Sequence, residues 1–199
     1  MWSLNNWKTV FAAVGLIGVL VFCLPSVSLF VRDPAGERFS ELYVLGPTHM
    51  AEGYPFNVSD GSNYLVYLGV GNHLGNSAFY EIHVKLRNSE DPLPNSTSAV
   101  ASSLPVLYKF RVFLGDGQVW EDGLSFSLHV GFLGNMSGVV GATFNGVSVD
   151  VNKFAAWDNV NNGYFYELFM ELWLMNTTSN AFSFDSRFVG FWLNMTAVS

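Results

Sequence analysis

The sequence has little cysteine and little charge. Its one cysteine, Cys23, excludes an intramolecular disulfide, a CxxC metal site and a redox pair. Charged residues make up 13% of the 199 residues, nine residues are Lys or Arg, and the net charge is −7. Nucleic-acid-binding proteins and polybasic membrane-surface proteins need a basic patch to bind phosphate groups. This composition argues against both classes.

The residues that are plentiful are apolar, with 50% hydrophobic and 16% aromatic, enough for a sizeable core in one domain. A run without charge extends from Thr9 to Val31, after Lys8. As a helix, residues 10–31 would be about 33 Å long, which is enough for a hydrocarbon core of about 30 Å. We therefore predict a cytoplasmic N-terminus (1–8), a transmembrane anchor in membrane lipid (9–31), a stalk (32–40) and an external domain (41–199).

A cleaved signal peptide is the alternative, with Ser26-Val27-Ser28 as a small-x-small cleavage site. The apolar run continues past that site, and Pro25 would kink a membrane helix without ending it. We therefore favour an uncleaved anchor. Within it, Cys23 is expected to face lipid or pack against a helix, and a lipidated or reactive thiol is the alternative.

Sequons for N-linked glycans decide the expected orientation. The positive-inside rule hardly favours either orientation, because Lys8 lies before the anchor and Arg32 and Arg38 lie after it. The sequons all follow the anchor and exceed the roughly two that chance predicts; they begin at Asn57, Asn95, Asn135, Asn176 and Asn194. Because glycans are added on the external face, we predict a single-pass protein of the cell membrane with its C-terminal domain outside.

Beyond the stalk, residues alternate between apolar and polar, which is typical of β-strands with one buried face. Residues 79–87 are the clearest case, because Tyr80, Ile82 and neighbours face one way and Glu81, His83, Lys85 and Arg87 face the other. Further strands are predicted at residues 41–45, 63–70, 106–114 and 124–132. Turn-rich segments at 46–63, 87–98 and 115–118 separate them. The pattern predicts a mainly β fold, an immunoglobulin-like antiparallel β-sandwich.

The last third of the chain is less regular. Asn145-Gly146 predicts a tight hairpin turn, and residues 152–163 are expected to hold one helical turn. Residues 164–175 fit a strand or a helix, and their aromatic content favours a strand. Residues 188–193 are apolar on both faces, so we expect a largely buried strand with Trp192 covered by the chain or by a partner.

Several of these segments resemble a known family. "ERFSELYVLGP" (37–47) and "AEGYPFNV" (51–58) resemble the opening of the external domain in an archaeal membrane-protein family, domain of unknown function 1616. Residues 66–86 resemble its next strand pair, and residues 164–196 its closing strands. The resemblance implies an archaeal source and an external domain, but no reaction. Many members have several membrane helices before this domain, whereas we predict one here.

Residues with catalytic or metal-binding chemistry do not form a recognisable constellation. Glu167 and Glu171 are about 13 Å apart on a strand, too far for a glycosidase pair, so a solvated or partner-facing position is expected. The four histidines lack metal-binding spacing, although His83 and His129 would be close if their strands paired. Loops containing Asp60, Asp116, Glu121 and Asp122 lack a complete calcium-binding pattern. We predict no enzyme, no cofactor and no metal.

Four tryptophans outside the anchor region remain open between core packing and a surface for partners or sugars: Trp120, Trp157, Trp173 and Trp192. The function expected from the sequence is a glycosylated structural or accessory subunit of an archaeal cell envelope. Its partners would be other envelope proteins or copies of itself, and not nucleic acid. A carbohydrate-binding or glycan-processing accessory module is the alternative.

Overall fold

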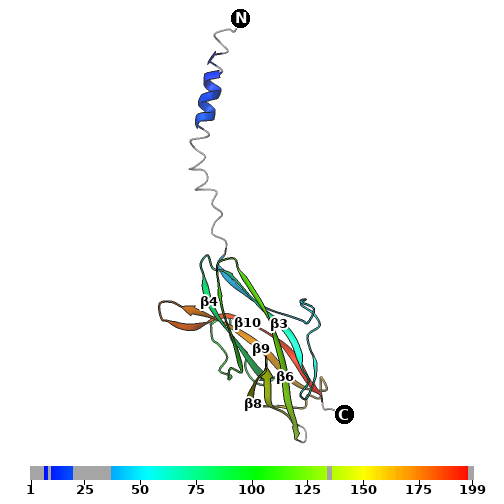
Figure 1. Ribbon diagram of the computed structural model, residues 1–199. Helices are drawn as coiled ribbons and strands as arrows, with labels where there is room; N and C mark the ends of the chain where they lie inside the picture. The colour runs from blue at the N-terminus through cyan, green and yellow to red at the C-terminus, as the bar shows by residue number, and fades with distance from the viewer. Residues whose placement is uncertain (1–6, 9, 20–36, 134–135, 197–199) are drawn as a thin grey trace. The chain divides into compact units, whose positions relative to one another are not determined.

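The computed structural model describes residues 7–8, 10–19, 37–133 and 136–196 (Figure 1). The chain divides into two units, Met1–Arg38 and Phe39–Ser199, which we treat separately.

In the first unit, residues 7–8 and 10–19 are α-helical and exposed. Within the described part of the chain, no helix is both long and apolar enough to cross a membrane. The anchor predicted for residues 9–31 stays a prediction. Its second half, residues 20–31 with Cys23, lies outside the described residues, and so do residues 32–36 of the stalk.

The second unit consists of β-strands in two five-stranded sheets (Figure 1). The first sheet has the order β1-β3-β6-β7-β8, with β1 at Phe39–Leu45, β3 at Tyr64–His73, β6 at Val119–Leu133, β7 at Met136–Phe144 and β8 at Val147–Ala156. The second has the order β2-β10-β9-β4-β5, with β2 at Asn57–Ser59, β4 at Ala78–Asn88, β5 at Tyr108–Leu114, β9 at Tyr164–Asn176 and β10 at Ala181–Thr196. This arrangement confirms a mainly β, sandwich-like fold.

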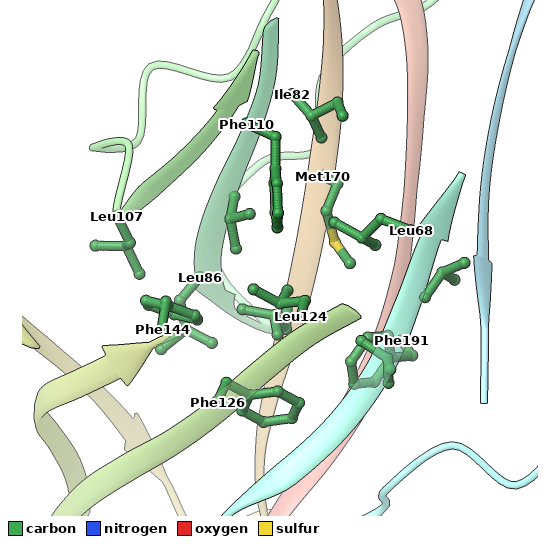
Figure 2. Close-up of a cluster of buried hydrophobic side chains, with 14 of the residues drawn as sticks. Leu68, Ile82, Leu86, Leu107, Phe110, Leu124, Phe126, Phe144, Met170 and Phe191 are labelled. Carbon is green, nitrogen blue, oxygen red and sulfur yellow. The ribbon is translucent and has the colours of Figure 1, made fainter. Parts of the chain in front are cut away.

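The core forms where the inner faces of the two sheets meet. Figure 2 shows side chains of the first sheet, such as Leu68 and Phe126, together with side chains of the second sheet, such as Ile82, Met170 and Phe191. All five are at most 7% exposed. These residues occupy alternate positions of their strands, so the period-two pattern of the sequence is the direct cause of the sandwich. Each fully buried side chain of this size contributes about 1.5–3 kcal/mol.

Neighbouring strands pair antiparallel, with one exception among the pairs described. β2 runs parallel to the end of β10, with Asn57 opposite Asn194 and Val58 opposite Met195. The prediction of an antiparallel sandwich is therefore correct except at this three-residue strand. β2 lies inside the segment 46–63 that we predicted as a turn, because three residues are too short to reveal an alternation.

The hairpin and the strand at 164–175 are confirmed. Asn145 and Gly146 join β7 to β8 with φ angles of 46° and 81°, as the favoured two-residue hairpin turn requires. The helical turn expected within 152–163 is wrong: β8 continues to Ala156, which is paired with Met136, and residues 158–163 form a turn in which Asp158 is paired with Gly163. β1 begins at Phe39, so two residues assigned to the stalk belong to the first strand.

Candidate functional site

The outer face of the second sheet carries charged side chains that are buried. Lys85 Nζ lies 2.9 Å from a Glu171 oxygen, and Arg87 Nε lies 2.5 Å from a Glu167 oxygen. The connection from β4 to β5 crosses this face, because the Ser102 amide donates to Glu171 and Lys85 donates to the Ser102 carbonyl, both at 2.7 Å. Glu167 and Glu171 are 8% and 0% exposed, so the expectation of a solvated or partner-facing pair is wrong.

A second buried charge cluster surrounds Glu81. Burial alone would raise the pKa of this carboxyl, but hydrogen bonds from His83, Arg111 and Lys109 outweigh it and lower the pKa to about 2. Burial lowers the pKa of His83, against the opposing hydrogen bond to Glu81. Both pKa shifts agree with a neutral His83 ring whose Nε2–H donates a hydrogen bond to the ionised Glu81 carboxylate, at 2.7 Å. Its Nδ1 atom is buried and has no hydrogen-bond partner among the described residues.

Next to the Arg87–Glu167 ion pair lies a pocket of about 450 Å³ with an aromatic lining. It is lined by Phe56, Ser89, Asp158, Asn161, Phe165 and Trp192. The Phe56 and Phe165 rings are 6.1 Å apart, and the Arg87 guanidinium lies 4.9 Å from the centre of the Trp192 ring. Trp192 is 39% exposed, so the prediction that it is buried is wrong. We call this cavity the Trp192 pocket.

The polar wall of the Trp192 pocket comes from the β8–β9 connection. Asp158 accepts hydrogen bonds from the Asn161 side chain and from the backbone N–H groups of Val160 and Asn161, at 2.7–3.1 Å. These bonds lower the pKa of the Asp158 carboxyl, the Asn161 side chain having the largest effect. A tight turn therefore presents an ionised carboxylate and an amide at the rim of an aromatic pocket.

The Asn194 side chain is fixed beside the pocket. It shares the outer face of β10 with Trp192, and it is the register partner of Phe165 on β9. Its Oδ1 accepts the backbone N–H of Tyr164, and its Nδ2 donates to Asn57 Oδ1, both at 3.2 Å. Gly163 is required here because a Cβ at that position would overlap Asn194 Oδ1.

The four candidate tryptophans do not form one platform. Trp120 is half-buried and packs edge-on against Phe110 of the core, whereas Trp173 is half-buried and stacks on His83 at 4.7 Å. Trp157 follows β8, is 41% exposed and contacts Tyr164. It lines a second pocket of about 290 Å³, which shares Ser89 and Asp158 with the Trp192 pocket. Trp157 and Trp192 therefore lie on either side of the Asp158 turn.

The predicted glycan acceptors lie in different surroundings. Asn57, Asn95 and Asn176 are exposed, Asn194 is half-buried, and Asn135 lies outside the described residues. Asn176 is at the turn between β9 and β10, where its Oδ1 accepts the backbone N–H of Thr178 at 2.9 Å. Their modification stays a prediction, and the accessible positions of three of them are compatible with it.

The histidines and loop carboxylates are dispersed. His83 belongs to β4 of the second sheet and His129 to β6 of the first, so their strands do not pair. Asp60 and Asp116 each accept a backbone N–H at 2.8 Å, and Glu121 bonds to His49 at 2.7 Å. Within the ranges that the structure describes, no group of three His, Cys, Asp or Glu side chains is arranged to hold a metal ion.

A comparison with protein families assigns the first part of the domain. The family model described as "Domain of unknown function (DUF1616)" matches residues 33–131. Residues 33–131 belong to the DUF1616 family. This confirms the resemblance for the opening strands, whereas the resemblance of residues 164–196 lies beyond the matched range. Only Phe56 and Ser89 of the Trp192 pocket lie inside the DUF1616 match, and the remaining lining residues follow it.

Other comparisons give no closer assignment. No curated protein matches the chain. Among solved structures, a β-glucosidase from Listeria innocua in complex with glucose has 9% identity and a TM-score of 0.39, over 80% of this chain and 16% of that chain. The human complex of Zinc 2-glycoprotein and Prolactin inducible protein has 8% identity and a TM-score of 0.39, over 82% of this chain and 100% of that chain. These similarities are too low to carry an argument about function.

Proposed function

We propose that the chain is a membrane-anchored, glycosylated accessory subunit of an archaeal cell envelope, whose external β-domain binds another envelope protein. The proposal includes the anchor at 9–31, the external position of the C-terminal domain and an immunoglobulin-like type of sandwich. It assigns the chain no catalytic role, no cofactor and no metal. The chain would bind its protein partner through exposed apolar side chains, which are described next. A second candidate function, described last, would use the Trp192 pocket.

The observation that carries the proposal is a group of exposed apolar side chains near the β6–β7 and β8–β9 connections. Phe132, Met136, Phe154 and Trp157 are between 40% and 49% exposed. Phe132 and Trp157 both contact Tyr164, with ring centres 5.5 Å and 5.1 Å apart. Met136, Phe154 and Trp157 also line one pocket. We call these four residues the apolar patch.

An apolar patch of this kind favours a protein partner. Exposed apolar groups that lie together on a soluble domain mark interaction sites more often than isolated ones do. Aromatic residues and methionine are also enriched in protein interfaces, where they supply much of the binding free energy. The chain has few Lys and Arg residues, so it has little positive charge with which to bind an anionic partner. A neighbouring envelope protein with a complementary apolar surface fits these properties.

The test is co-purification from native membranes in mild detergent, with variants of the patch. Trp157→Ala should reduce recovery of the partner at least tenfold, because truncating an interface aromatic typically costs about 1.4 kcal/mol or more. Val147→Ala is the matched control, since Val147 is 52% exposed at the other end of β8. Equal recovery with both variants would exclude the patch as the interface. Light scattering of the purified chain separates a different partner from a second copy of the chain.

A carbohydrate-binding or glycan-processing accessory role is the second candidate. The Trp192 pocket favours it, because exposed aromatic rings beside Asp158, Asn161 and Ser89 offer both an apolar face and polar groups to a sugar. Glycan binding that is lost in Trp192→Ala, and kept in Trp157→Ala, would support this function over a protein-binding role.

A further inference from the structure

We propose that the Trp192 pocket holds the first sugar of a glycan that is attached to the chain's own Asn194. This inference rests on the proposed external position of the domain, because the glycan must be added there. It goes further by assigning one acceptor and by giving the pocket an intramolecular ligand.

Position along the strand is the first argument. Asn194 begins the sequon Asn194-Met195-Thr196, and Trp192 precedes it by two residues. In a strand, side chains two residues apart lie on the same face, about 6.6 Å from each other. On the neighbouring strand, Phe165 is directly opposite Asn194. A sugar on Asn194 is therefore bordered by two aromatic side chains that line the pocket.

The hydrogen bonds of Asn194 are the second argument. A carboxamide nitrogen carries two hydrogens. One bond, from Nδ2 to Asn57 Oδ1 at 3.2 Å, is formed within the described structure. In this proposal the sugar takes the place of the second hydrogen, and the bond to Asn57 and the bond from Tyr164 to Oδ1 are both kept. Those two bonds then fix the direction of the sugar.

The lining of the pocket is the third argument. A pyranose ring has an apolar face of C–H groups and an equatorial rim of hydroxyl groups. The ring faces of Trp192 and Phe165 can pack against the C–H face of the sugar. The polar side chains of Asp158, Asn161 and Ser89 can form hydrogen bonds with its hydroxyl groups. The volume of about 450 Å³ is large enough for one sugar ring.

The covalent step is an ordinary group transfer. An envelope transferase forms the bond between Nδ2 and the anomeric carbon of a phosphate-activated sugar. The phosphate leaves with the electrons of the broken carbon–oxygen bond, and Nδ2 gives up one proton. No oxidant, reductant or metal of this chain takes part.

The experiment compares the full chain from native membranes with two variants that remove a sequon without changing its asparagine. Thr196→Ala prevents modification of Asn194, and Thr97→Ala is the matched control for the exposed Asn95. Glycopeptide mass spectrometry gives the occupancy of each site. We expect Asn194 to be occupied in the unchanged chain and Thr196→Ala to lower Tm by about 2–4 °C. Thr97→Ala should leave Tm unchanged.

A double-mutant comparison then tests the contact with the pocket. In a Trp192→Ala background, adding Thr196→Ala should cause little further change, because the contact is already lost. An undiminished shift there would show that the sugar stabilises the chain without using the pocket, and would overturn the inference. An empty Asn194 beside other occupied sequons would also overturn it while leaving the proposed external location intact. Empty sequons throughout would contradict the proposed function itself.

A further experiment tests whether the pocket holds the chain's own attached glycan or a free glycan. The chain's N-glycans, released enzymatically, should bind Thr196→Ala and not the fully occupied chain. Binding of these free glycans to the occupied chain, lost on Trp192→Ala, would assign the pocket to an external sugar and overturn the inference.

Discussion

Buried ion pairs on the outer face of the second sheet make single charged residues important for stability. Replacing Lys85 with Met leaves Glu171 buried, 0% exposed, without its cation. Breaking such a pair from one side costs about 3–5 kcal/mol. Lys109→Met is the control, because its side chain is 44% exposed and its ion pair with Glu81 should contribute about 1 kcal/mol or less. Chemical denaturation of the purified full chain measures both; equal effects would show that Lys85 is not buried as described.

The His83–Glu81 pair predicts how stability depends on pH. Burial lowers the pKa of His83 below its ordinary value of 6.5, so the unfolded chain takes up a proton first as the pH falls. Stability is then lost progressively below pH 6.5. The pKa of Glu81 is about 2 in the folded chain and 4.5 as its ordinary value. Its contribution to stability is therefore lost as the pH falls from 4.5 to about 2. Tm measured from neutral pH to about pH 5 isolates the histidine effect.

His83→Gln should give a Tm that changes less in that interval than the Tm of the unchanged chain. His129→Gln is the control, because His129 is exposed. A loss of stability of the same size in all three proteins would contradict the assignment to His83.

Sequence patterns identified the outward side chains of β4 and β9 but not their environment. Alternation places Glu81, His83, Lys85 and Arg87 on one face, and that face is indeed outside the sandwich. It does not reveal that the β4–β5 connection returns over this face, since no local pattern records where a long loop lies. The same limitation applies to Trp192. The apolar sequence around it suggested cover on both faces, whereas only the inward side chains Phe191 and Leu193 are buried.

At the scale of the strands, close contact between β9 and β10 limits what can replace Gly190. A Cβ there would lie 2.7 Å from the Phe169 Cβ and 2.8 Å from a Glu167 oxygen. We expect Gly190→Ala to cost about 1–3 kcal/mol through overpacking. Gly131→Ala in β6 is the control, because no atom lies within 4 Å of the added Cβ. Thermal unfolding of both variants tests this; a similar Tm would mean that the strands separate easily.

Strands with regular alternation could be predicted, and elements defined by distant pairing could not. Residues 79–87 and 164–175 correspond to β4 and β9, and the Asn145-Gly146 turn has its predicted hairpin form. β2 exists only because residues 57–59 pair with the end of β10. β8 extends to Ala156 because β7 pairs with it there, overriding the local turn signals. The Trp192 pocket combines three connections with β9 and β10, so no single segment predicts it.

At the scale of the whole molecule, we predict that the native chain retains its N-terminal segment and carries sugar. Intact-mass analysis combined with N-terminal sequencing should find residues before Ser28 and a mass above that of the 22.0 kDa polypeptide. An apolar run longer than the central region of a signal peptide is the reason for the first expectation. A mature start near Leu29 would contradict the anchor, and an unmodified mass would contradict the external location of the domain.

The parallel pairing of β2 with β10 delays completion of the fold during synthesis. Asn57 and Asn194 are 137 positions apart, so the second sheet stays open until nearly all of the domain has left the ribosome. At about 5–20 residues per second this interval lasts roughly 7–27 s. Throughout it, Asn57 lacks its β10 partner Asn194, and we expect the proposed modifying enzyme to reach it. Asn194 emerges last and becomes half-buried beside Asn57 soon afterwards, so the two predicted acceptors have very different times in which to react. Slower translation of the final strands would therefore change occupancy at Asn194 much more than at Asn57.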